Sequence, residues 1–263
     1  MIKSSKKTIV VAMIATLFSA FIGLVGIVSA PISAEAASKN GTVIYKTVGR
    51  VSESGLSEIV LSGEKKKEGA YVKNIKITVR DLRTKKAKTI ISPKENAGYS
   101  PAITLADFTG DGIKEIFYNA NSGGSGAFAY SYVYKISEEG YDTIFDFDSV
   151  KNEYSANYTD GYKIKVNNAA NDKSYYIDIS GRGEEYLGGI YDENGKLKTP
   201  LAAEVSAVNT VLPFFMPDVN KYGLMIMRRI TGLYSADSFG YTQEFTEYTE
   251  NGFSPYFSGI LIT

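Results

Sequence analysis

Side chains alternate between two environments along most of the chain after residue 41, and this period of two constrains the fold more than any other feature. From Phe128 to Ile136, large apolar or aromatic residues occupy every second position, and small or polar residues lie between them. Successive side chains of a strand point to opposite faces of a sheet, whereas a helix cannot bury residues at this spacing on one side. We therefore predict a strand here, paired on both sides, with its aromatic face buried.

Similar alternation covers residues 75–79, 162–166 and 175–179, and turn signals occur at Asp160-Gly161 and Asn194-Gly195. Asp-Gly and Asn-Gly favour the tight turns that connect antiparallel strands. Short strands separated by turns every ~8–12 residues are typical of an antiparallel sandwich, barrel or propeller. The sequence thus predicts an all-β, antiparallel fold.

The sequence indicates an internal repeat at an offset of about 111 residues, where the segment from Asp107 to Gly112 corresponds to the segment from Asp218 to Gly223. Phe128 and Tyr130 have counterparts at the same offset, and residues 138–141 have counterparts in 250–253 after a slip of one residue. This suggests a duplication relating 101–200 and 210–263. Four segments of about four strands each, near 42–95, 101–148, 155–200 and 210–263, predict a small or incomplete β-propeller of about four blades. A β-sandwich is the alternative.

The N-terminus has the pattern of a secretory signal peptide. Three lysines within the first seven residues precede an apolar run from Ile9 to Val28, and a small-x-small site follows at Ala34-Glu35-Ala36. We predict a signal peptide over residues 1–37 and a mature domain over 38–263, secreted and possibly attached to the cell surface. The alternative is an uncleaved anchor, because the apolar run approaches the length that spans a bilayer.

The residue types that are missing exclude several kinds of chemistry. The chain contains no His and no Cys, which rules out a Ser-His-Asp triad, a cysteine nucleophile and the usual zinc sites. Oxygen ligands remain, and these select hard ions such as calcium. A formal net charge of zero gives no electrostatic argument for nucleic acid or an anionic membrane as a partner.

One loop, between expected strands at 103–105 and 116–118, offers ligands with regular spacing. Oxygens at positions 1, 3, 5, 7 and 9 can converge on one ion, and Gly112 at position 6 permits the bend that turns the next carbonyl inward. The predicted calcium ligands are the side chains of Asp107, Thr109, Asp111 and Glu115 and the carbonyl of Ile113. An EF-hand would also need a bidentate Glu at position 12, which here is Tyr118. The alternative is an Asp-Gly turn that satisfies its own hydrogen bonds.

The stretch from Leu105 to Ile116 resembles the FG-GAP or VCBS repeat family, whose blades carry a D-x-[DNT]-x-D-G-x-x-[DE] loop between two strands. The chain as a whole is similar to exported VCBS-repeat-containing bacterial proteins. This resemblance implies that the acidic residues bind calcium and that the blades form a propeller used for adhesion and binding. The second loop keeps Asp218 but has Tyr222 and Ile226 where acidic ligands belong, so we expect it to bind no ion.

These features favour a non-enzymatic, calcium-binding β module for attachment, scaffolding or recognition of an unknown protein or carbohydrate. The alternative is a carbohydrate-active enzyme or a carbohydrate-binding module, since two carboxylates suffice for glycoside hydrolysis. Candidate pairs are Asp146 with Asp148 and Glu184 with Glu185. A sensor or inhibitor held at the membrane by an uncleaved N-terminus is a third possibility. The twenty tyrosines predict cross-strand packing, with a sugar-stacking surface as the alternative.

Overall fold

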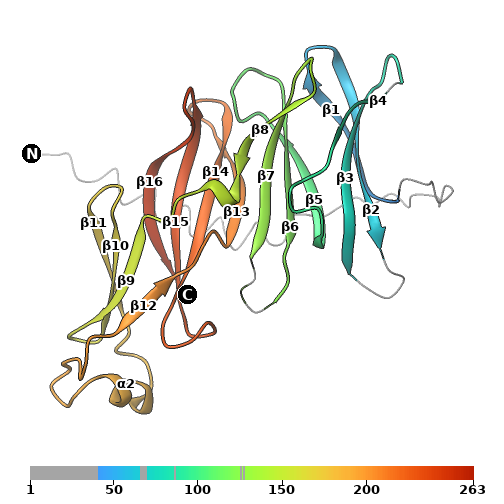
Figure 1. Cartoon of the computed structure of the whole chain (residues 1–263). Helices are drawn as coiled ribbons and strands as arrows, with labels where there is room; N and C mark the ends of the chain where they lie inside the picture. The colour runs from blue at the N-terminus through green and yellow to red at the C-terminus, as the bar shows by residue number, and fades with distance from the viewer. Residues whose placement is uncertain (1–40, 66–69, 86, 125, 127) are drawn as a thin grey trace, which may run out of the picture. The chain divides into compact units, whose positions relative to one another are not determined.

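The computed structural model describes residues 41–65, 70–85, 87–124, 126 and 128–263 (Figure 1). The predicted signal peptide, residues 1–37, lies outside these ranges, so its cleavage stays a prediction. No helix in the described ranges is long and apolar enough to cross a membrane.

The first half of the described chain forms one antiparallel sheet of eight strands, in the order β1-β2-β3-β5-β6-β7-β8, with β4 paired to β3. A short 3-10 helix, η1, follows β8. The strands of this sheet curl so that β1 contacts β5, and the N–H of Lys114 donates to the carbonyl of Arg50 at 3.0 Å. These contacts make the sheet nearly a closed barrel. The elements are β1 (Thr42–Ser52), β2 (Gly55–Lys65), β3 (Tyr71–Asp81), β4 (Ala87–Ile91), β5 (Gly98–Ala106), β6 (Glu115–Asn121), β7 (Ala129–Ile136), β8 (Tyr141–Asp146) and η1 (Phe147–Ser149).

The second half forms another antiparallel sheet of eight strands, in the order β11-β10-β9-β12-β14-β15-β16, with β13 paired to β14. A short helix, α2, lies between β11 and β12 (Figure 1). The elements are β9 (Tyr154–Thr159), β10 (Lys163–Asn168), β11 (Lys173–Asp178), α2 (Glu184–Ile190), β12 (Ala202–Val205), β13 (Thr210–Met216), β14 (Lys221–Thr231), β15 (Ser238–Thr249) and β16 (Gly252–Ile262).

The all-β, antiparallel expectation is confirmed, and the strands fall into four successive groups of four: β1–β4, β5–β8, β9–β12 and β13–β16. These groups correspond to the four expected segments, except that β12 extends the third group to residue 205, beyond the expected end at residue 200. Within each sheet, two groups are joined by a ladder of only two residue pairs. The first joint pairs Tyr71 with Tyr99 and Val72 with Gly98, and the second pairs β12 with the end of β14 at residues 230 and 231.

The strand predicted from Phe128 to Ile136 is β7, which pairs with β6 on one side and β8 on the other. Tyr132, Tyr134 and Ile136 on its aromatic face are buried, as predicted. The opposite face is also covered, because Ser131 and Val133 are fully buried. Alternation therefore located the strand correctly, but it did not show that β7 lies between two cores.

Three apolar clusters hold the fold together. The first lies inside the first sheet, where the stacked rings of Tyr118 and Tyr132 have centroids 6.2 Å apart. The second lies against β9, β10 and α2. The third joins the two sheets and combines Ala106, Phe108, Phe117, Val133 and Phe145 with Val208, Val211, Leu224 and Ile226. Because burial of aromatic and branched side chains is the main favourable term in folding, this third cluster fixes one sheet against the other.

The repeated sequence motifs occupy equivalent hairpins of the second and fourth groups. The loop at Asp107 connects β5 to β6, and the loop at Asp218 connects β13 to β14. Residues 138–141 cover the β7–β8 turn and the first residue of β8, and residues 250–253 cover the β15–β16 turn and the first two residues of β16. The repeat spacing therefore corresponds to a repeated strand order.

Candidate functional site

The loop from Asp107 to Glu115 connects β5 and β6, which are the flanking strands that the sequence predicts. Its backbone turns through two glycines with positive φ, Gly110 at 80° and Gly112 at 81°. Residues with a Cβ rarely adopt this conformation, so the bend expected at Gly112 depends on glycine.

Backbone N–H groups of the loop are satisfied by the carboxylates of Asp107 and Asp111. Asp107 Oδ1 accepts from the N–H of Gly110 at 2.6 Å, and its Oδ2 accepts from the N–H of Gly112 at 2.8 Å. Asp111 Oδ1 accepts from the N–H of Ile113 at 2.8 Å. These contacts are the self-contained hydrogen bonds of an Asp-Gly turn, which was the alternative to a calcium site.

Glu115 is the only one of the three loop carboxylates that is fully buried in the described structure. Its Oε2 accepts from the N–H groups of Phe108 at 2.8 Å and Thr109 at 3.3 Å, and its Oε1 accepts from the Thr109 hydroxyl at 2.8 Å. Burial raises the pKa of this carboxyl, and the hydrogen bonds that it accepts oppose the rise. Glu115 therefore forms the inner wall of the loop.

A lysine that sequence reasoning did not include occupies the centre of the site. Lys135, on β7, places its Nζ 2.8 Å from Asp111 Oδ2, 3.3 Å from Thr109 Oγ1 and 3.8 Å from Glu115 Oε1. Burial lowers the pKa of Lys135, but the hydrogen bond to Asp111 and the negative charges of Asp111 and Glu115 together outweigh burial, so the pKa of Lys135 is raised. Burial likewise raises the pKa of Asp111, but the hydrogen bonds from Lys135 and from the N–H of Ile113, with the positive charge of Lys135, together outweigh burial, so the pKa of Asp111 is lowered. Both groups are held in their charged forms.

The structure therefore brings together three of the five predicted calcium ligands, Thr109, Asp111 and Glu115, around an ammonium group. The carboxylate of Asp107 points to backbone N–H groups instead, and Ile113 contacts Asp111 through its N–H. Within the residues that the structure describes, no group of three or more acidic side chains is arranged to hold a metal ion. Calcium ligation stays a prediction. The signal that sequence reasoning missed was a lysine on the otherwise small and apolar face of β7.

The second loop packs directly against the first. The N–H of Tyr222 donates to the carbonyl of Asp107 at 2.7 Å, and the ring of Tyr222 lies 6.3 Å from that of Phe108. The Asp107 loop therefore contacts the second sheet through this backbone hydrogen bond and through the Phe108 ring, which also lies 5.8 Å from the ring of Phe253.

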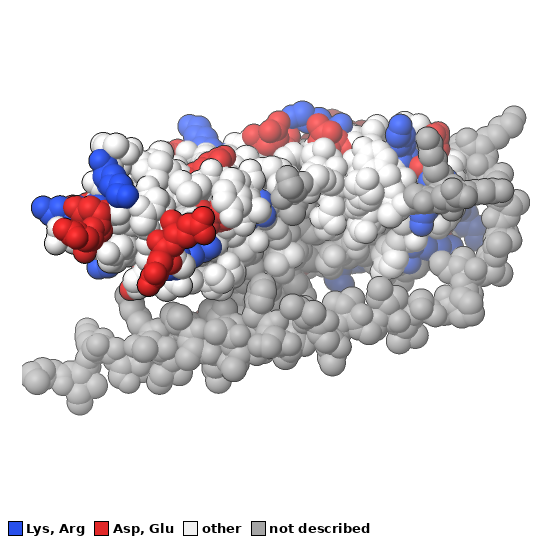
Figure 2. Space-filling model, turned by 90° about the horizontal axis from the view of Figure 1, so that it is seen from below, with Lys and Arg blue, Asp and Glu red and all other residues white. Residues whose placement is uncertain are grey.

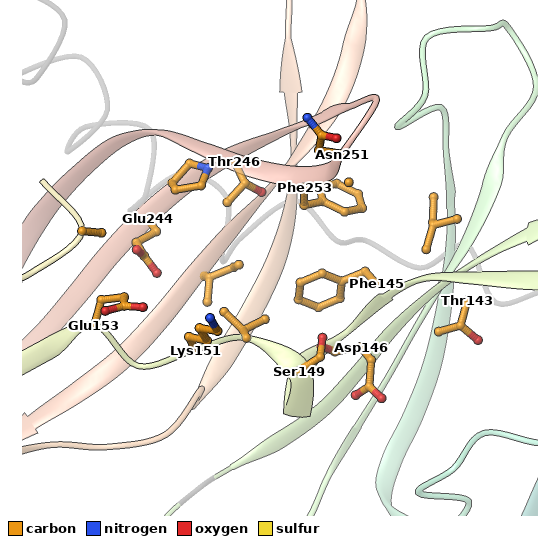
Figure 3. Close-up of a pocket in the computed structure, with 16 residues that line it drawn as sticks. Thr143, Phe145, Asp146, Ser149, Lys151, Glu153, Glu244, Thr246, Asn251 and Phe253 are labelled. Carbon is orange, nitrogen blue, oxygen red and sulfur yellow. The ribbon is translucent and has the colours of Figure 1, made fainter.

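A cleft of about 500 Å³ lies beside this junction, between β8 and η1 of the first sheet and β15 and β16 of the second (Figure 3). Phe145 and Phe253 lie at one end, with ring centroids 5.6 Å apart, and Lys151, Glu153 and Glu244 gather at the other. The cleft could not be predicted from the sequence, because it forms between strands that are far apart along the chain.

Glu244 is held in the cleft by a buried guanidinium group. Arg228 is fully buried, its Nη1 lies 2.6 Å from Glu244 Oε2, and its Nη2 donates to the carbonyl of Lys151 at 2.7 Å. These contacts restrict the orientation of the Glu244 carboxylate at this end of the cleft.

The acidic pairs proposed for a carbohydrate-active enzyme do not meet in the cleft. Asp146 lines it, but Asp148 pairs with Lys94 at 2.9 Å and is not part of the lining. Glu184 and Glu185 lie exposed in the first turn of α2 and are not part of the lining either.

The fold and the two sites define a class: an antiparallel β module with a glycine-containing loop whose oxygens surround a lysine ammonium, and a mixed polar and aromatic cleft between its sheets. The chain belongs to the YybI family. Residues 152–260 match the model of the YybI C-terminal domain. Over 204 residues the chain is 33% identical to the uncharacterized protein YybI of Bacillus subtilis (strain 168). The aligned region covers 76% of this chain and 78% of that protein.

The resemblance to FG-GAP or VCBS repeats is therefore wrong, since the family comparisons place the chain with YybI. The matched family domain covers the second sheet, whereas the twelve-residue motif lies in the first. That motif is largely explained by local hydrogen bonding, because Asp107 and Asp111 cap the N–H groups of a glycine-containing turn. Such a pattern can arise in unrelated β hairpins, and it does not identify a repeat family here.

Proposed function

We propose that the protein is a non-enzymatic, exported β module that serves attachment, scaffolding or recognition outside the cytoplasm, with calcium as a structural ion of the Asp107 loop. The observation that carries the calcium proposal is the convergence of three side-chain oxygens on Lys135 Nζ. Oxygens that already surround an ammonium ion are oriented for a cation. Calcium binds at this position by displacing Lys135, because two cations cannot share one set of oxygens.

The distribution of charge supports a partner other than nucleic acid. On the face shown in Figure 2, basic and acidic side chains are mixed among the residues drawn in colour, and no broad basic patch is visible there. Nucleic-acid binding depends on clustered Lys and Arg that replace counterions along the phosphate backbone. The zero formal net charge of the chain agrees with this reading.

Calcium titration of the Lys135→Met variant tests the proposed ion. Removing the ammonium leaves the Asp111 and Glu115 carboxylates without their counter-charge, so we expect calorimetry to show calcium binding at least ~5-fold tighter than in the wild type. Calcium at ~100 times its dissociation constant is expected to add roughly 2.7 kcal/mol to the free energy of unfolding. The affinity for calcium is expected to decrease as the pH is lowered, because burial raises the pKa of Glu115 and a protonated carboxyl is a poor ligand.

Two further variants complete the calcium experiment. Asp111→Ala is expected to abolish the calcium effect, whereas Asp218→Ala in the second loop is expected to leave it unchanged. If neither the wild type nor Lys135→Met binds calcium, and chelator does not alter the unfolding midpoint of either, the loop is a self-contained turn with Lys135 as its permanent cation.

Export is tested at the N-terminus of the protein recovered from culture. We expect the mature chain to begin at Ala37 or Ser38 and to lie outside the cytoplasm, because the first residues have the order of a signal peptide. Intact-mass measurement and N-terminal sequencing give the answer. Recovery of the uncut chain in the membrane fraction alone would instead support the anchor.

A further inference from the structure

The cleft between β8 and β15–β16 has two ends of different chemistry. At the aromatic end, Phe145 is buried and Phe253 is half-buried, so a face of apolar atoms is offered to a ligand. At the other end, the side chains of Lys151 and Glu153 are exposed and make no hydrogen bond or ion pair within the described residues (Figure 3). A cleft of about 500 Å³ is in the range of small-molecule sites, which combine apolar walls with a few polar groups.

Glu244 provides a fixed acceptor at the charged end. Its Oε2 is held by Arg228, and its Oε1 has no hydrogen-bond partner among the described residues. Arg228 is itself fixed by burial and by its hydrogen bond to the Lys151 carbonyl. The carboxylate therefore keeps its orientation when no ligand is present, and this lowers the entropic cost of binding.

The charges at this end balance one another. At this end the carboxylates of Glu153 and Glu244 are matched by the cationic groups of Lys151 and Arg228, and the further carboxylate of the lining, Asp146, lies beside Ser149, nearer the aromatic end. A charged ligand would unbalance this set. A neutral ligand with several hydroxyl groups would satisfy it, because each hydroxyl can donate to a carboxylate and accept from an ammonium. Asn251 adds an uncharged donor and acceptor to the lining near Phe253.

We propose that this cleft binds a neutral saccharide, with its hydroxyl groups on Glu244, Glu153 and Lys151 and an apolar C–H face on Phe253. This inference deepens the proposed recognition role by naming the ligand class and the site. It does not depend on calcium, because the loop and the cleft use different side chains.

The probes are three neutral disaccharides, cellobiose, maltose and N,N′-diacetylchitobiose, with lysine and cadaverine as charged comparisons. Saturation-transfer NMR on the mature protein is expected to show transfer to ring C–H protons of at least one disaccharide and none to the amines. Calorimetry with that disaccharide is expected to show an affinity loss of about tenfold in Glu153→Gln and in Lys151→Met, since each removes a charge-assisted hydrogen bond. Both side chains are exposed, so both variants are expected to fold.

Glu193→Gln is the matched control, because Glu193 is an exposed glutamate that does not line the cleft. Its affinity is expected to equal that of the wild type. The inference is overturned if no disaccharide binds, if the amines bind in their place, or if Glu153→Gln and Lys151→Met bind as the control does. Hydrolysis of a bound disaccharide would contradict the non-enzymatic role and leave the binding site intact, so the two proposals fail in different ways.

Discussion

The Phe108→Ala substitution is expected to lower the free energy of unfolding by about 3–5 kcal/mol relative to the wild type. Phe108 is fully buried in the cluster between the sheets, where its ring lies 5.8 Å from that of Phe253 and 6.3 Å from that of Tyr222. Truncation removes apolar contacts on both sides and leaves a cavity that neither rigid sheet can close. Denaturant unfolding of the purified mature domain measures the loss.

Phe257→Ala serves as the control, because Phe257 is 48% exposed on β16 and contacts the ring of Phe245. Its expected cost is below ~1.5 kcal/mol. Equal losses in the two variants would mean that the cluster between the sheets does not dominate stability.

Arg228→Met is expected to lower the free energy of unfolding by about 3–5 kcal/mol, because it leaves the Glu244 carboxylate in a largely buried position without its counter-charge. The double variant Arg228→Met with Glu244→Leu removes both charges at once. It is expected to regain most of the loss, since replacing a buried ion pair by apolar residues is often neutral or stabilising.

The double-mutant cycle is read from denaturant midpoints of the four proteins. A double variant no more stable than Arg228→Met would show that Arg228 contributes through its packing over the Tyr154 ring, which lies 5.9 Å away, and not through its charge.

Periodicity predicted the strands well, because alternation is a local property of the chain. The strand expected at 75–79 lies within β3, and the Asp160-Gly161 turn connects β9 to β10, with Gly161 at a φ of 77°. The helix α2 was not predicted, since Gly188 and Gly189 weaken helix propensity. Tertiary contacts hold it in place. The Tyr186 hydroxyl donates to Asp237 at 2.6 Å, and Leu187 packs against the second core.

The site was predicted only in part, because its decisive contacts are long-range. The spacing of Asp107, Asp111 and Glu115 indicated a glycine-containing loop, but only Asp111 and Glu115 direct carboxylate oxygens at the Lys135 ammonium, whereas Asp107 accepts from backbone N–H groups. The spacing did not predict that the Lys135 side chain on β7 would contact the loop, or that Glu244 on β15 would pair with Arg228 on the neighbouring strand β14. Those pairings depend on strand register, which no single stretch of this sequence specifies.

In the described part of the chain, most strands pair with the strand next to them in sequence, and the exceptions are β3 with β5, β9 with β12 and β12 with β14. Nearly every ladder can therefore form by closing a short hairpin, which takes microseconds, before distant segments meet. Under the proposed export, with the N-terminus crossing the membrane first, each group of four strands can be assembled while the next is still emerging. We expect the joints and the cluster between the sheets to form last, when the preformed groups of strands dock, because their contacts join residues far apart in sequence.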